Sequence, residues 1–193
     1  MKTIVLLLAL ILPIAAGPKH HHPAYDLREG DIVFQGNAGP QSDAIRKATG
    51  SPYTHCGVVT EINGRLAVLE AVQPVRISPI DDFIRRSLPG TFHARRLSSP
   101  LNQERVGQAR NWVEKQTGKA YDLKFAWGDD QLYCSELVWK LFHAGGVDLC
   151  KTRRFRDYNL NDPVVKRIIT ERYGSIEKLP RDEPVVSPGD LAA

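Results

Sequence analysis

The clearest pattern of apolar residues along the chain predicts a β-hairpin. Two largely apolar runs, residues 56–62 and 65–71, flank the dipeptide Asn63-Gly64. An Asn-Gly pair favours a type I′ turn, because both central residues of that turn take positive φ. A two-residue turn places Ile62 opposite Arg65, and this pair fixes the register of both strands.

Shorter apolar runs, helical spacing and capping residues predict the other elements. Strands are expected at residues 32–35, 72–78 and 91–97, and helices at residues 42–50, 81–86, 100–117, 132–144 and 163–173. The longest helix should begin with Ser99 as its N-cap and Pro100 as its first residue. We expect residues 180–193, which are rich in proline and charge, to pack loosely as coil. A small, mostly antiparallel sheet, flat or curled into an open barrel, with separate helices packed against it defines an α+β domain.

The first residues are typical of a secretory signal peptide. A short basic start is followed by an apolar run from Ile4 to Ala16 and by small residues up to Gly17. The run is shorter than the ~20 residues that a spanning helix needs, so a stable membrane anchor is not expected. We therefore divide the chain into a signal peptide (1–17), a polar linker (18–24) and a single domain (25–193) that works in the periplasm or outside the cell.

Neither the net charge nor the histidines of the N-terminal segment indicate a binding partner. The chain has 193 residues, with 26 Lys and Arg against 22 Asp and Glu, and removal of residues 1–17 takes away one Lys and leaves a net charge of +3. This excess is small and scattered, so a nucleic-acid groove is not expected. Three adjacent histidines, His20, His21 and His22, cannot converge on one metal ion from an extended chain, and no metal site is predicted there.

In an oxidising compartment, the odd number of cysteines means that they cannot all form intramolecular disulfides. With only Cys56, Cys134 and Cys150, at most one intramolecular disulfide can form and at least one thiol stays unpaired. A thiol kept in such a compartment is either buried and inert or retained for its reactivity.

Cys134 has the position of a nucleophile. It lies in the first turn of a predicted helix, where unpaired backbone N–H groups and the helix dipole favour a thiolate. The same N–H groups can receive an oxyanion. The alternative is a core cysteine on the apolar side of the helix.

The hairpin offers a base for this nucleophile. Its register places His55 opposite Val72, so Glu70 is the diagonal neighbour of His55 on the same face of the sheet. A carboxylate in this place fixes the imidazole tautomer and stabilises the imidazolium. Cys134, His55 and Glu70 together could transfer an acyl group through a thioester. Glu136 is closer to Cys134 along the chain, but two residues on a helix do not face each other.

Several motifs, taken in order, also carry a family resemblance. They are Gly30-Asp31-Ile32-Val33-Phe34-Gln35, Ser51-Pro52-Tyr53-Thr54-His55-Cys56-Gly57, Glu70-Ala71, Tyr121-Asp122 and the segment 125–140 around Tyr133-Cys134-Ser135-Glu136. From about residue 30 to 188 the chain resembles the YiiX-like proteins, which are circularly permuted, papain-like cysteine peptidases or amidases related to the NlpC-type cell-wall hydrolases. The resemblance implies a permuted papain-like fold, in which the histidine hairpin precedes the cysteine helix.

The resemblance also implies roles for individual residues. Cys134 is the expected nucleophile, His55 the base and Glu70 the third member of the triad. Cys56 departs from the plain apolar residue expected at its position. Because it faces away from His55, we interpret it as structural, and it could pair with Cys150.

Two tyrosines are weaker candidates for substrate or oxyanion binding. Tyr53 could lend its hydroxyl to the oxyanion, and Tyr133 could line the cleft. For each of them packing in the core is an equally open interpretation.

We expect a secreted or periplasmic cysteine hydrolase that cleaves an amide, in cell-wall peptide or another small molecule. The same triad would also suit a hydrolase or acyltransferase acting on a lipid ester or thioester. A binding module without activity is the third possibility. The mechanism requires no metal or organic cofactor.

Overall fold

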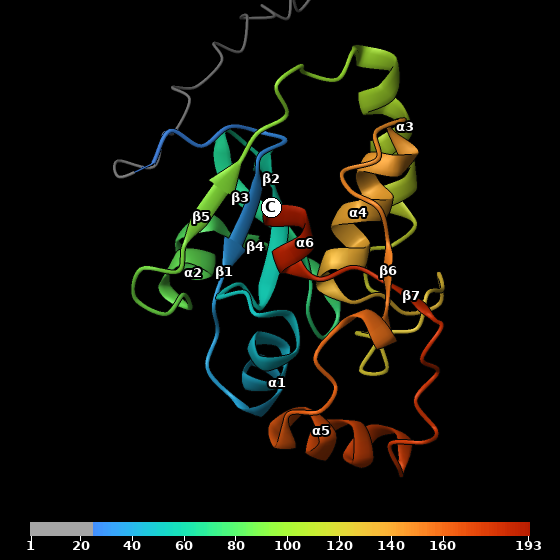
Figure 1. Ribbon diagram of the computed structural model, residues 1–193. Coiled ribbons are helices and arrows are strands. Elements are labelled where there is room, and N and C mark those ends of the chain that lie inside the picture. Colours follow the sequence, from blue (N-terminus) through green and yellow to red (C-terminus); the bar gives the residue numbers. More distant parts are fainter. Residues whose placement is uncertain (1–24) are drawn as a thin grey trace, which may run out of the picture.

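Five antiparallel strands form one sheet in the order β4-β3-β2-β1-β5 (Figure 1). The computed structural model describes residues 25–193, so the expected signal peptide, the linker and His20, His21 and His22 lie outside the described residues. The strands are β1 (Ile32–Gln35), β2 (His55–Ile62), β3 (Arg65–Ala71), β4 (Val75–Pro79) and β5 (His93–Arg95). β4 and β5 are the edges of the sheet, which therefore forms no closed barrel.

The predicted hairpin register is confirmed. Ile62 pairs with Arg65, and Asn63 and Gly64 have φ of 50° and 75°. Gly57 lies at a close approach of β2 to β3. A Cβ atom at Gly57 would lie 2.7 Å from the Leu69 carbonyl oxygen and would also overlap the Val68 side chain.

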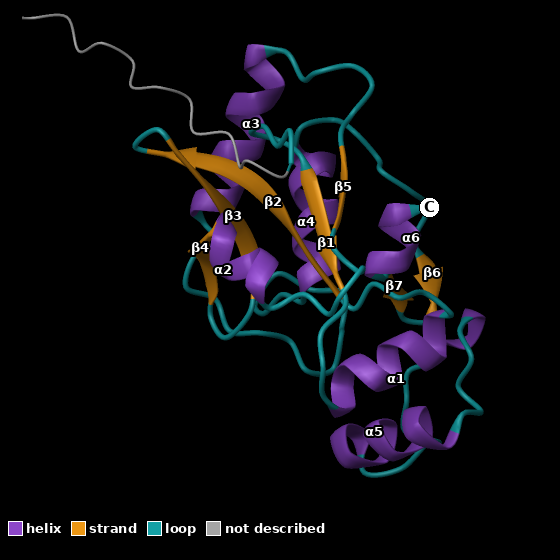
Figure 2. Cartoon of the chain, turned by 90° about the vertical axis from the view of Figure 1, so that its left-hand side faces the viewer, coloured by secondary structure: helices purple, strands orange, loops and turns teal. Residues whose placement is uncertain are grey.

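Helices cover both faces and one end of the sheet (Figure 2). They are α1 (Pro40–Thr49), α2 (Ile80–Arg85), α3 (Gln103–Glu114), α4 (Cys134–Ala144), α5 (Pro163–Tyr173) and α6 (Pro188–Ala192). The short strands β6 (Arg153–Arg154) and β7 (Pro184–Val185) form a separate pair, and a 3-10 turn (Phe155–Asp157) directly follows β6. α1 and α5 pack against each other beyond the end of the sheet (Figures 1 and 2).

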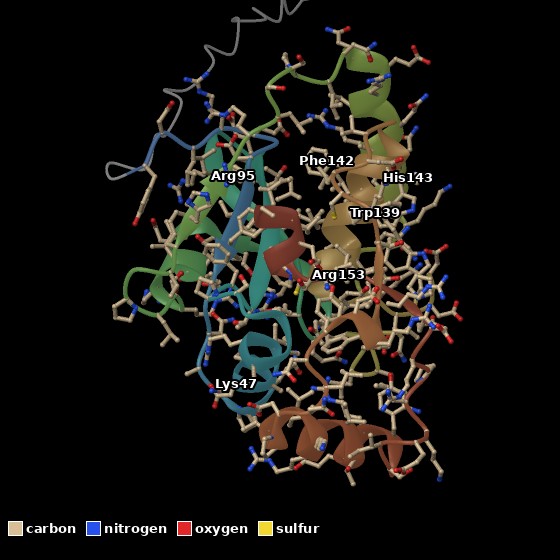
Figure 3. All side chains as sticks on the ribbon, viewed as in Figure 1. Lys47, Arg95, Trp139, Phe142, His143 and Arg153 are labelled. Atoms are coloured by element: carbon tan, nitrogen blue, oxygen red, sulfur yellow. The ribbon has the colours of Figure 1, made fainter. Side chains whose placement is uncertain are left out.

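Successive side chains of a strand point to opposite faces of the sheet, so the core forms two clusters, one on each face. The larger cluster joins one face of the sheet, including Phe34, to Leu137 and Val138 of α4. The smaller cluster joins the other face to Phe83 of α2. At the C-terminal end of α4, Phe142 points toward the sheet and the exposed His143 points away from it (Figure 3). Cys134, the first residue of the same helix, lines a cavity together with residues of α1 and α5.

Two local expectations are wrong. The N-cap of α3 is Asn102, not Ser99, and its side chain accepts a hydrogen bond from the Arg105 amide at 2.9 Å. An Asn side chain caps a helix as well as Ser does, so either residue satisfied the sequence rule.

The C-terminal segment is not a loose coil. Val185, Val186, Leu191 and Ala192 are buried, and Ser187 caps α6. The few apolar residues of this segment are enough to anchor it, because they fill the large core cluster.

Among residues 25–193, none of the helices combines the length and the apolar character that crossing a bilayer requires.

Candidate active site

His55 and Glu70 lie side by side, as the register predicts. His55 is the first residue of β2, and its Nε2 atom lies 2.6 Å from Oε2 of Glu70 on β3. The ring of Phe83 stacks on the imidazole with 5.6 Å between centroids. Both side chains are buried, so water does not compete for the hydrogen bond between them.

Arg86 holds the other oxygen of the Glu70 carboxylate. Its Nη2 atom lies 2.6 Å from Glu70 Oε1. Burial alone would raise the pKa of Glu70, but hydrogen bonds from His55, Ser78 and Arg86 outweigh it and lower that pKa to about 2. Glu70 is therefore a buried carboxylate that its partners keep ionised. Sequence reasoning missed Arg86, because it follows α2 in the chain and no local pattern links it to the hairpin.

Cys134 is the first residue of α4 and is 3% exposed. The residues on both sides of it are tied to the C-terminal segment. Ser135 Oγ donates to the Val186 carbonyl at 2.8 Å, and the Val186 amide donates to the Tyr133 hydroxyl at 3.2 Å. These two hydrogen bonds fix the start of α4 against the chain that leads into α6.

Cys134 and His55 form a hydrogen-bonded pair that favours charge separation. Glu70 occupies Nε2 of His55, which leaves Nδ1 for the sulfur. Burial lowers the pKa of His55, but the hydrogen bonds to Cys134 and Glu70 outweigh it and raise that pKa to about 9. The Cys134 pKa lies well below its usual value, because Cys56 and His55 donate hydrogen bonds to the sulfur and together outweigh burial. The two shifts together favour a thiolate on Cys134 beside an imidazolium on His55.

Cys56 does not form a disulfide with Cys150. All three cysteines are free thiols. Cys56 lies beside the first residue of α4, whereas Cys150 follows the end of that helix, and an 11-residue helix is about 16 Å long. A disulfide needs Cα atoms within about 7 Å.

Cys56 instead belongs to the site. Its thiol and its backbone amide both donate to the Cys134 sulfur, while burial and the neighbouring thiolate raise the pKa of Cys56 itself. It packs in the core cluster that contains the α4 residues, and its contact with Cys134 was not predicted from the sequence. The signal in the sequence was only its place next to His55.

The remaining candidates lie near the site in different settings. Tyr53 packs against the rings of Phe34 and His93, at 5.6 and 5.8 Å between centroids. Tyr133 is the N-cap of α4 and is 2% exposed. Glu136 is buried away from His55, and its Oε1 accepts from the Gly128 amide at 3.1 Å and lies 2.9 Å from Lys140 Nζ. Burial raises the pKa of Glu136 to about 7, although Lys140 opposes it.

Two hollows lie beside Cys134 and His55. A cavity of about 110 Å³ has Cys134 in its wall, and we name it the apolar chamber. A groove of about 780 Å³ has His55 in its wall, and we name it the polar groove. Typical wall residues of the chamber are Ala44, Ala48, Phe155, Val165, Ile169 and Val185. Typical wall residues of the groove are Asn37, Thr54, Gln73, Asp122, Lys124 and Gln131.

Comparisons with known proteins bear on this geometry. The family model described as "Permuted papain-like amidase enzyme, YaeF/YiiX, C92 family" matches residues 26–193. The uncharacterized protein YiiX of Escherichia coli strain K12 is 34% identical over 189 residues, which cover 97% of this chain and 90% of that protein. A crystal structure described as the metalloprotein YiiX from Escherichia coli O157:H7 matches with a TM-score of 0.80 and 35% identity, over 87% of this chain and 93% of that chain. In residues 25–193 of the present chain, no group of three or more His, Cys, Asp or Glu is placed to hold a metal ion.

Proposed function

The chain belongs to the C92 family of permuted papain-like amidases, and from that premise we propose that it is a cysteine amidase or peptidase with Cys134 as nucleophile. The observation that carries the proposal is the hydrogen-bonded series from Cys134 through His55 to Glu70. The low pKa of the thiol and the raised pKa of the imidazole are those of a nucleophile paired with its general acid.

The reaction begins with attack of the Cys134 thiolate on an amide carbonyl. Backbone N–H groups in the first turn of α4 receive the negative oxygen of the tetrahedral intermediate. His55 gives the proton on Nδ1 to the departing amine, while its Nε2 proton stays on the hydrogen bond to Glu70. The acyl group is then a thioester on Cys134.

Water completes the cycle. Neutral His55 takes a proton from a water molecule, which attacks the thioester carbonyl. Cys134 leaves as a thiolate, and His55 is again an imidazolium. Arg86 holds one oxygen of Glu70, so the other oxygen stays on Nε2 of His55. This hydrogen bond keeps the Nε2 proton in place throughout the reaction.

Small amides, including peptides of the cell wall, are the substrate class we favour, with the periplasm or the exterior as the site of action. A second candidate, hydrolysis or transfer of a lipid ester or thioester, is supported by the apolar chamber at Cys134. A binding module without activity would have no use for a thiolate hydrogen-bonded to a histidine.

The test is stoichiometric labelling with iodoacetamide at pH 6.5. An ordinary thiol with a pKa of about 8.5 is roughly 1% ionised there, so Cys134 should react far faster, by about 100-fold. His55→Ala should remove most of this excess. Cys150→Ala is the matched control, since Cys150 is a free thiol outside the site. Equal rates for Cys134 and Cys150 would refute the catalytic proposal.

Substrates can be separated by incubating the protein with muropeptides and with phospholipids. Products that appear in mass spectra with the wild type but not with Cys134→Ala identify the class that is cleaved. Cleavage of neither by a protein with a reactive thiol would point to another small amide.

A further inference from the structure

Two free thiols meet at the candidate nucleophile. The Cys56 thiol and the Cys56 backbone amide both donate hydrogen bonds to the Cys134 sulfur. Cys56 is the second residue of β2, and Cys134 is the first residue of α4, the helix that packs on that strand. Both side chains lie in the same core cluster, and neither belongs to a disulfide. Two thiols in contact can be oxidised to a disulfide, which a single thiol cannot form within its own chain.

The contact brings the two sulfur atoms close to a bonding position. A hydrogen bond between two thiols places their sulfurs near van der Waals contact. The second hydrogen bond ties the Cys134 sulfur to the backbone of Cys56, which holds the two Cα atoms near the separation of about 7 Å or less that a disulfide needs. Cys150 has no such position, because it lies beyond the other end of the 11-residue helix, which is about 16 Å long.

The two thiols differ in exposure and in reactivity. Cys134 is 3% exposed and lines a cavity, whereas Cys56 is 0% exposed. Hydrogen bonds from Cys56 and His55 favour the thiolate form of Cys134, and the thiolate is the form that oxidants attack. Cys56 stays a protonated thiol, because burial and the charge on the neighbouring sulfur raise its pKa. A small oxidant therefore reacts with Cys134 first, while the Cys56 thiol is in contact with it.

We propose that Cys56 is the resolving cysteine of a redox switch at Cys134, in which a hydroperoxide joins the two residues in a disulfide and a dithiol separates them again. The switch rests on the proposed function for one point, the reactivity of the Cys134 thiolate, and it adds a means of regulation to that function. While the disulfide exists, Cys134 has no thiolate to attack an amide, so hydrolysis stops.

Two steps make the disulfide with one molecule of hydrogen peroxide. The Cys134 sulfur attacks one peroxide oxygen, so an S–O bond forms and the O–O bond breaks. The departing hydroxide takes a proton from the His55 imidazolium and becomes water. Cys134 is then a sulfenic acid, and the negative charge beside Cys56 is gone. The Cys56 sulfur attacks the Cys134 sulfur, and the hydroxyl group leaves with the Cys56 proton as a second water. The two sulfurs lose two electrons in all, and both go to the peroxide.

The disulfide also protects the nucleophile. A sulfenic acid with no thiol in reach is oxidised further to a sulfinic acid, which dithiols do not reduce. Because Cys56 is already in contact with Cys134, its thiol reacts at a high effective concentration and competes with a second peroxide. Labelling of Cys134 should therefore recover after oxidation only in a protein that keeps Cys56.

The test treats the intact protein with hydrogen peroxide and measures the labelling of Cys134 by iodoacetamide before and after oxidation. In the wild type, oxidation should lower the labelling rate at least about 10-fold, and dithiothreitol should restore it. Digestion without reduction should yield two peptides joined through Cys56 and Cys134, together about 2 Da lighter than the reduced peptides. Cys150→Ala is the matched control and should behave as the wild type, because Cys150 is a free thiol outside the site.

Two variants remove the resolving thiol. Cys56→Ala leaves a smaller side chain, and Cys56→Ser keeps the size and a hydrogen-bond donor. Each variant is compared with its own labelling rate before oxidation. In both, peroxide should add about 32 Da, the mass of two oxygen atoms, to the peptide that contains Cys134, and dithiothreitol should not restore labelling.

The outcomes separate this inference from the proposed function. If untreated Cys134 is labelled rapidly but peroxide produces a sulfinic acid and no disulfide with Cys56, the switch is refuted while the nucleophile stands. Recovery of Cys56→Ser as complete as that of the wild type, or a disulfide between Cys134 and Cys150, would refute the switch as well. Slow labelling of untreated Cys134 would instead refute the function itself.

Discussion

Glu70 carries a charge in the interior, and the stability of the fold should depend on that charge. Its carboxylate is fully buried and lies 2.6 Å from both His55 and Arg86. A fall in its pKa from 4.5 to about 2 corresponds to about 3 kcal/mol of preference for the ionised form. Replacing Glu70 by Gln keeps the size of the side chain and removes this contribution. We expect the variant to be about 3 kcal/mol less stable than the wild type at pH 7.

The dependence on pH gives this prediction its sharpest test. Because the folded pKa is lower than the unfolded one, the contribution is complete above pH 4.5 and is lost as the pH falls through about 2. At pH 3 the difference between wild type and Glu70→Gln should shrink to about 1 kcal/mol. Urea unfolding followed by tryptophan fluorescence at both pH values measures it.

Arg86→Gln is the control for a general loss of charge. The Arg86 side chain is 36% exposed, so its removal should cost about 1 kcal/mol or less at pH 7. If Glu70→Gln were as stable as the wild type at pH 7, or if its deficit stayed constant down to pH 3, the assignment of an ionised, buried orienting group would be wrong.

Three further predictions concern the thiol and the hairpin. Amide hydrolysis should rise with pH as Cys134 ionises, well below the usual thiol range, and should fall near pH 9 as His55 loses its proton; an activity that keeps rising to pH 10 would contradict this. Cys56→Ala removes a thiol donor and should slow alkylation of Cys134 more at pH 6 than at pH 10, whereas equal slowing at both would place the effect elsewhere. Gly57→Ala should lower the free energy of unfolding, measured by urea denaturation, by at least about 2 kcal/mol. Its control, Gly107→Ala, lies in an open position on α3 and should be neutral or stabilising by up to about 1 kcal/mol. Similar values for the two variants would refute the close approach of the strands.

The part of the site that the sequence predicts is the part governed by local rules. Asn63-Gly64 sets one turn, that turn sets the pairing, and the pairing places Glu70 beside His55. The position of Cys134 at a helix start follows from helical spacing in the same way. The permuted papain-like fold was implied by the family resemblance that the ordered motifs carry, and the family match confirms it.

What escaped prediction depends on contacts between distant segments. Arg86 reaches Glu70 only after α2 has packed on the sheet. Cys56 meets Cys134 only because α4 lies over β2, and counting cysteines suggested Cys150 as its partner instead. A propensity rule describes a residue and its neighbours, so it carries no information on which segments the core brings together.

The contact between Ser135 and Val186 also bears on when the protein can first act. The two residues are 51 positions apart. At roughly 10 residues per second, their synthesis is separated by about 5 s. During that interval the residues of the hairpin and of the start of α4 have been made, but the segment that fixes the start of α4 has not. The surroundings of Cys134 are therefore completed late, and a nascent chain carries Cys134, His55 and Glu70 for several seconds before it carries the segment that holds Cys134 in place.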